Sequence, residues 1–90
     1  AQNYPNQFNP STTIRYDLPN ASVVSLRVYD VLGREVATLV ANEEQQPGVH
    51  NVRFDARNLS SGLYVSELRA TSQESNAATF RDAKKLGLLR

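Results

Sequence analysis

The 90-residue sequence contains no cysteine and no methionine, and it has a single histidine, His50. The missing thiols exclude disulfides, thiolate metal sites and cysteine nucleophiles together. A lone imidazole without cysteine is also a poor metal ligand. No apolar run approaches the roughly 20 residues that a membrane-spanning helix needs, and no N-terminal signal peptide is recognisable. The chain begins at Ala1 rather than methionine, so we expect it to be part of a longer protein.

The length and the charge restrict the function further. We expect a single domain over residues 1–90, in which a core fits but a deep enclosed active site has little room. The net charge is +1, which does not suit a polyelectrolyte binder. The charge is nevertheless uneven: from Arg81 onward there are four basic residues and one acidic residue, against six basic and eight acidic residues before it.

Turn-forming residues punctuate the chain at regular intervals. They occur at Pro19–Ser22, Leu32–Arg34, Gln45–Gly48, Asn58–Gly62 and Ser72–Asn76. The segments between them suit strands, over Thr12–Leu18, Ser22–Asp30, Arg34–Ala41, Val49–Asp55, Leu63–Thr71 and one or two strands within Ala77–Arg90. Strands at spacings of about 8–12 residues predict an all-β fold, an immunoglobulin-like Greek-key β-sandwich of about seven antiparallel strands.

Two local patterns refine this prediction. Val36 and Leu39 are out of phase with a simple alternation, which predicts a bulge or bend. A helix over Glu35–Glu44 is the main alternative, but its β-branched run and the lack of a wide apolar face argue against it. The alternating segment Leu63–Thr71 is expected to bury one face, which consists of Tyr64, Ser66, Leu68 and Ala70.

The first residues form a stiff lead-in, which we place over residues 1–11, before a sandwich over residues 12–90. Pro5 and Pro10 fix the backbone there and cannot sit inside a central strand. We expect this segment to lie across the sandwich edge or its end, with Tyr4 and Phe8 tucked against the core.

Each candidate chemical group has a more ordinary structural explanation. Glu43 and Glu44 are expected in a solvated loop, and His50 in a structural position beside Val52 and Phe54. The segment "LSSGLY" lacks the spacing of a nucleophile elbow, and the aspartates are too scattered for a calcium loop. The outward arginines alternate with acids, so they do not predict a nucleic-acid surface. We therefore expect no catalytic residue, no metal and no cofactor.

Glycines mark two structural devices. Gly62 is predicted to take a positive φ before a strand, so that the hydroxyl of Tyr64 bonds back to the preceding loop, as in the tyrosine corner of sandwiches. In "YDVLGREV", Gly33 is predicted at the left-handed position of a tight hairpin.

Four segments together resemble a known family: "YPNQFNPSTTIRYDLP", "VSLRVYDVLGREVATLV", "GVHNVRFDARNLSSGLY" and "KKLGLLR". They are similar to the type A C-terminal sorting domain of type IX secretion cargo in the Bacteroidetes, which is related to the immunoglobulin-like domain of the flagellar hook-cap protein. The resemblance implies a non-enzymatic sorting signal attached to an N-terminal cargo domain. Its implied partners are an outer-membrane translocon and a cysteine-protease sortase, with export through the periplasm to the cell surface or the extracellular space.

The family's recurrent positions fall on several residues of this chain. They are Pro5, Asn6, Phe8, Asn9 and Pro10 in the lead-in, Gly62 and Tyr64, and the tail Lys84, Lys85, Leu86, Gly87, Leu88, Leu89 and Arg90. The tail is the expected recognition site, whereas the other positions, with Gly33, are expected to be mainly structural. Gln7, Ser66, Glu67 and Gly87 depart from the family pattern.

Two alternatives remain open from the sequence. The domain can be a passive immunoglobulin-like spacer or a carbohydrate-binding module of a secreted hydrolase, although the latter requires an exposed row of aromatics. The tail can also be only the last core strand, whose basic side chains lay their aliphatic stems on apolar surface and keep their charges in water. For the sorting domain we expect no nucleic-acid partner and no membrane insertion.

Overall fold

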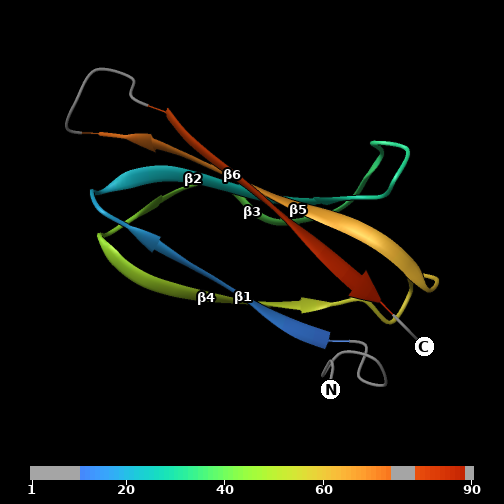
Figure 1. The fold of residues 1–90 in the computed structure, drawn as a ribbon. Helices are drawn as coiled ribbons and strands as arrows, with labels where there is room; N and C mark the ends of the chain where they lie inside the picture. Colours follow the sequence, from blue (N-terminus) through green and yellow to red (C-terminus); the bar gives the residue numbers. More distant parts are fainter. Residues whose placement is uncertain (1–10, 74–78, 89–90) are drawn as a thin grey trace.

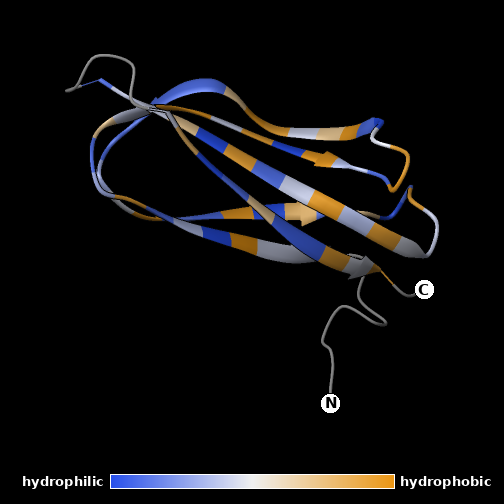
Figure 2. Cartoon of the chain, turned by 45° about the horizontal axis from the view of Figure 1, so that its top comes forward, coloured by the Kyte–Doolittle hydropathy of each residue, from blue (hydrophilic) through white to orange (hydrophobic). Residues whose placement is uncertain are grey.

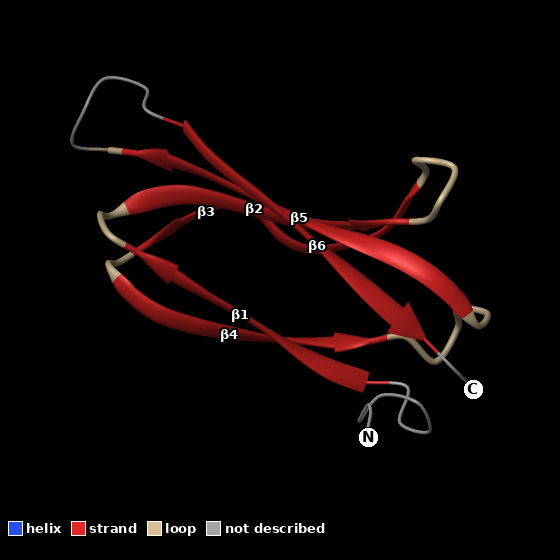
Figure 3. Ribbon diagram, viewed as in Figure 1, coloured by secondary structure: helices blue, strands red, loops and turns tan. Residues whose placement is uncertain are grey.

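The computed structural model describes residues 11–73 and 79–88. These residues form strands joined by turns, with no helix among them (Figure 3). The strands are β1 (Ser11–Leu18), β2 (Ser22–Tyr29), β3 (Glu35–Gln45), β4 (Gly48–Asp55), β5 (Gly62–Ser72) and β6 (Thr79–Leu88). The prediction of an all-β fold is confirmed, with six strands in the described residues instead of about seven.

The strands form two antiparallel sheets that face each other as a sandwich (Figure 1). One sheet contains β1 and β4, and the other has the order β3-β2-β5-β6. The chain therefore crosses between the sheets three times, after β1, β3 and β4. The second sheet has two strands more than the first, and β6 and β3 are its edges.

Hydrophobic and hydrophilic residues alternate along the strands, as the bands of Figure 2 show, and buried hydrophobic residues of both sheets form one core cluster. The most completely buried side chains are Leu18, Leu26, Val24 and Val28. Each such side chain stabilises the fold by about 1.5–3 kcal/mol relative to an exposed position. The predicted inward face of β5 is confirmed, because Tyr64, Ser66, Leu68 and Ala70 are all buried.

Strand β3 corrects one prediction. It continues to Gln45, so Glu43 and Glu44 lie in a strand, paired with Val24 and Val23 of β2, and not in a polar loop. An edge strand can satisfy its backbone on one side while its charged side chains stay in water. The predicted irregularity is confirmed by register shifts between β2 and β3 and by Asn42, whose φ is 51°.

The two predicted glycine positions are confirmed. Gly33 has a φ of 83° and Gly62 a φ of 155°, both in the region that favours glycine. The hydroxyl of Tyr64 donates a hydrogen bond of 2.7 Å to the carbonyl oxygen of Ser60. This bond joins the start of β5 to the loop before it, as expected for a tyrosine corner.

Candidate functional site

Strand β6, which carries most of the predicted recognition residues, lies at the edge of the four-stranded sheet. It pairs with β5 along its whole length, from Gly62↔Leu88 to Thr71↔Thr79. Along its other side there is no further strand in the described part of the chain. A backbone edge of this kind is where an extended peptide can add to a sheet.

Alternation divides β6 into two faces. Leu86 and Leu88 lie on the inner face, where Leu86 is opposite Tyr64 and Leu88 is 9% exposed. Both leucines pack on the core cluster. The predicted leucines of the tail therefore anchor the strand to the domain, as far as the described residues reach.

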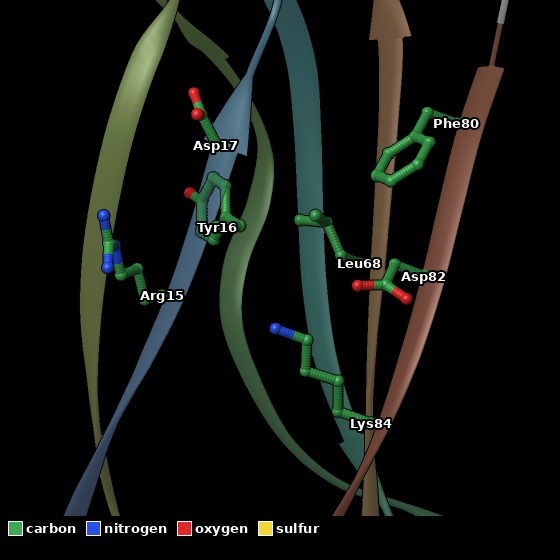
Figure 4. A pocket seen from close by; sticks show the side chains of 7 residues that line it. All are labelled: Arg15, Tyr16, Asp17, Leu68, Phe80, Asp82 and Lys84. Carbon is green, nitrogen blue, oxygen red and sulfur yellow. The ribbon is translucent and has the colours of Figure 1, made fainter.

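The two lysines are neighbours in sequence but project to opposite sides of the sheet. Lys84 lies on the inner face, where its side chain points toward β1 (Figure 4). Lys85 lies on the outer face, opposite Val65 of β5. Both are exposed. A partner that contacts both ammonium groups must therefore reach around the edge of β6.

A groove with a volume of about 320 Å³ lies between β6 and β1. From β6, the side chains of Phe80, Asp82 and Lys84 project into it (Figure 4). Leu68 forms its floor together with Tyr16 of β1. Sequence reasoning missed Phe80 and Asp82 here, although both share the phase of Lys84. The groove holds charges of both signs, so it does not select an anion or a cation.

Arg81, the other cation on the outer face of β6, forms an ion pair. Arg81 lies directly opposite Arg69 of β5, and Glu67 contacts both, at 2.8 Å from Arg81 and 3.5 Å from Arg69. The hydrogen bond from Arg81 lowers the pKa of the Glu67 carboxyl, and the charge of Arg69 adds to this effect. In contrast, no acidic side chain of the described residues forms an ion pair with Lys84 or Lys85.

His50 is held by contacts with β1 and with the turn before β4. His50 stacks on Tyr16, with ring centroids 5.4 Å apart, and its Nε2 lies 2.8 Å from the carbonyl oxygen of Gln46. No group of three potential metal ligands is found within residues 11–73 and 79–88. The same residues include no helix long and apolar enough to cross a membrane.

The aromatic side chains do not form a sugar-stacking row over the described ranges. Tyr16, Phe54 and Tyr64 are buried as predicted, and Phe80 is the large exposed aromatic at 51%. Tyr29 is half-buried on the outer face. A flat platform of several aromatics, which a carbohydrate-binding module uses, is thus not present in this part of the chain.

Several predicted positions lie outside the described residues. These are Pro5, Asn6, Phe8, Asn9 and Pro10 of the lead-in, and Leu89 and Arg90 of the tail. The packing expected for the lead-in therefore stays a prediction.

The chain matches a known family. The family model described as "Secretion system C-terminal sorting domain" matches residues 2–79. No curated protein and no solved structure matches the chain significantly. The matched residues end at Thr79, the first residue of β6, so the rest of this strand lies beyond the match.

Proposed function

This chain belongs to the family of secretion system C-terminal sorting domains, and we propose that it directs an attached cargo protein across the outer membrane by the type IX system. In this proposal the domain has no catalytic role, and its cargo reaches the cell surface or the extracellular space. The translocon recognises the folded domain, and a cysteine-protease sortase then removes it. The family match supports the sorting role, and the sequence resemblance supports the named partners.

The position of β6 is the observation that carries this proposal. A sorting signal must be accessible after the domain has folded, and β6 is an edge strand with two exposed lysines that lack an ion pair with any described residue. A receptor strand can pair with such an edge, because main-chain hydrogen bonds supply affinity and the alternating side chains supply specificity. Lys84 and Lys85 would favour an acidic receptor surface and accelerate the encounter.

Leu88 determines how the proposal has to be tested. Because Leu88 is buried at the end of β6, removal of residues 86–90 takes away core contacts together with the tail. A loss of export after this deletion can therefore result from unfolding. Charge reversal of the exposed lysines leaves the core intact and is the more selective perturbation.

The test compares two double variants of the domain fused to a reporter, in a host that has this secretion system. Lys84→Glu with Lys85→Glu reverses the charges on β6. Arg53→Glu with Arg57→Glu makes the same charge change at exposed positions on β4 and just after it, away from the groove between β6 and β1. Both double variants should keep the free energy of unfolding within about 1 kcal/mol of the parent, because exposed charges and exposed ion pairs contribute little.

We expect the β6 variant to lower the exported fraction of the reporter, whereas the control variant is exported like the parent. Equal export of all three proteins would remove Lys84 and Lys85 from the recognition site. An equal loss in both variants would show that overall charge, and not β6, is recognised.

A further inference from the structure

The turn between β2 and β3 exposes two branched aliphatic side chains next to each other. Val31 is 70% exposed and Leu32 is 74% exposed, the two highest values among the large hydrophobic residues that are described. The turn projects from one end of the sandwich, beyond the strands that it connects (Figure 1). Single exposed aliphatics are common on protein surfaces, but an adjacent pair at the tip of a projection is unusual.

The fold does not require these two residue types. A hydrogen bond of 3.0 Å from the amide of Gly33 to the carbonyl oxygen of Asp30 closes the turn, and Gly33 supplies its left-handed residue. This arrangement fits a three-residue hairpin loop built on a type I turn, whose central positions accept most residues. Val31 and Leu32 occupy those central positions, where polar side chains would remain in water without a penalty.

The turn is also held in one conformation. The Asp30 carboxylate accepts hydrogen bonds of 2.9 Å from the amides of Leu32 and Arg34, and a third of 2.9 Å from Nε of Arg34. The amide of Asp30 donates a bond of 2.9 Å to the carbonyl oxygen of Arg34. A preformed loop loses little conformational entropy when it binds, so more of its contact energy is retained as affinity.

The charges at the base of the turn are already paired. Arg34 contacts Asp30 at 2.9 Å, and Arg27 contacts Glu35 at 3.7 Å. The turn therefore presents apolar surface above a base in which these charges compensate each other. A cleft that receives it has to be apolar, and its binding should depend little on salt.

The turn and the C-terminal half of β6 lie at the same end of the sheet. Tyr29, the residue before the turn, is opposite Val65 of β5, and Val65 is opposite Lys85 of β6. Two strand spacings separate β2 from β6, about 10 Å. On β5 between them, Leu63 adds a further apolar side chain that is 46% exposed. One partner can therefore contact the turn and Lys85 together.

We propose that Val31 and Leu32 form a docking element that inserts into an apolar cleft of a protein of the export apparatus. This inference rests on the proposed sorting function and adds a second contact to the one made by β6. A protein cleft fits better than a lipid bilayer, because two aliphatic side chains bury far less apolar surface than the single acyl chain that gives only marginal membrane binding. A rigid, shaped cleft makes use of the fixed geometry of the turn, which a fluid bilayer does not.

The test replaces the two aliphatics and leaves the turn in place. Val31→Ser with Leu32→Ser keeps Asp30 and Gly33, so the hairpin and the melting temperature should be retained. The matched control is Val49→Ser, at a position that is 47% exposed on β4 in the other sheet. Each is measured as a reporter fusion for export, and as free domain competing with the parent fusion for export.

We expect the exported fraction to fall at least about tenfold for the turn variant, because two apolar contacts are lost at once. The free variant, which keeps its β6 contact, should compete correspondingly less well than the free parent domain. Val49→Ser should behave like the parent. In a second variant, Asp30→Asn, both aliphatic side chains remain but the hydrogen bonds that fix the turn are weakened. We expect an intermediate loss of export.

The outcomes separate this inference from the proposed function. If charge reversal on β6 lowers export while the turn variant is exported and competes like the parent, the docking element is refuted and the sorting function stands. If neither change affects export, both proposals fail. Binding of the purified parent domain to phosphatidylethanolamine–phosphatidylglycerol vesicles that is lost in the turn variant would overturn the protein cleft in favour of a membrane contact.

Discussion

The bond between Tyr64 and Ser60 allows a quantitative test of the tyrosine corner. In Tyr64→Phe the ring stays in the core and only the hydroxyl is removed. The side chain is 6% exposed, and its hydroxyl donates to the Ser60 carbonyl oxygen over 2.7 Å. No other packing contact of the ring has to change, so the substitution isolates the hydrogen bond.

The expected loss is small and can be bounded. An intramolecular hydrogen bond contributes a net 0.5–1.5 kcal/mol, roughly, to the free energy of unfolding. Ser60 lies in an exposed loop, where water can solvate its released carbonyl oxygen, so we expect a value near 1 kcal/mol or below. For a domain of this size, about 1 kcal/mol corresponds to a decrease of roughly 4–8 °C in melting temperature. Tyr64→Ala, which also removes the ring, should cost about 3–5 kcal/mol.

Urea denaturation of the parent and both variants, with calorimetry in parallel, measures these differences. The prediction is an ordered series in which Tyr64→Phe loses a fraction of what Tyr64→Ala loses, with unchanged denaturant dependence. If Tyr64→Phe unfolds like the parent, the hydrogen bond does not stabilise the corner. If Tyr64→Ala also unfolds like the parent, the ring is not a core element at all.

Three further predictions concern Gly62, Asp30 and the lead-in. Gly62→Val should lower the free energy of unfolding by about 1–3 kcal/mol. The cost comes from the backbone, whose φ is 155°, and not from a clash, since the nearest atom to an added Cβ is 4.0 Å away. A parental denaturation midpoint would contradict a strained backbone there. Hydrogen bonds from Arg34 and Leu32 lower the pKa of Asp30. The stabilisation by the Asp30 carboxylate should therefore be complete above the ordinary pKa, near 3.9, and be lost as the pH falls through the folded-state pKa. An NMR titration in which this carboxyl titrates at the ordinary pKa would disprove these hydrogen bonds. Deletion of residues 1–10 should lower the melting temperature, as expected if the lead-in covers an apolar edge, and an unchanged calorimetric transition would make it a linker.

Local alternation was sufficient to predict much of the core. Leu26 and Val28 in β2, or Leu68 and Ala70 in β5, follow a period of two, and their burial depends mainly on that period. Gly62 could also be predicted, because a positive φ is a property of the local backbone. These features require no knowledge of which strands become neighbours.

Features that depend on strand neighbours were missed or misplaced. The polar residues at the end of β3 suggest a loop, but their backbone groups pair with β2 and a strand results. Phe80 and Asp82 face β1, a segment more than 60 residues earlier in the sequence, so their groove appears only when both sheets are assembled. The separation of Lys84 from Lys85 likewise has meaning only once β6 is known to be an edge.

The most direct test of the sorting function is the location of a reporter fused to the N-terminus of this 90-residue chain. The fusion and the unfused reporter are expressed in a host with the type IX system and in the same host without its translocon, and the surface, medium and periplasmic fractions are quantified. The account predicts that the reporter reaches the surface or medium only when it carries the domain and the translocon is present. Export without the translocon, or retention of the fusion in the periplasm of the intact host, would contradict it.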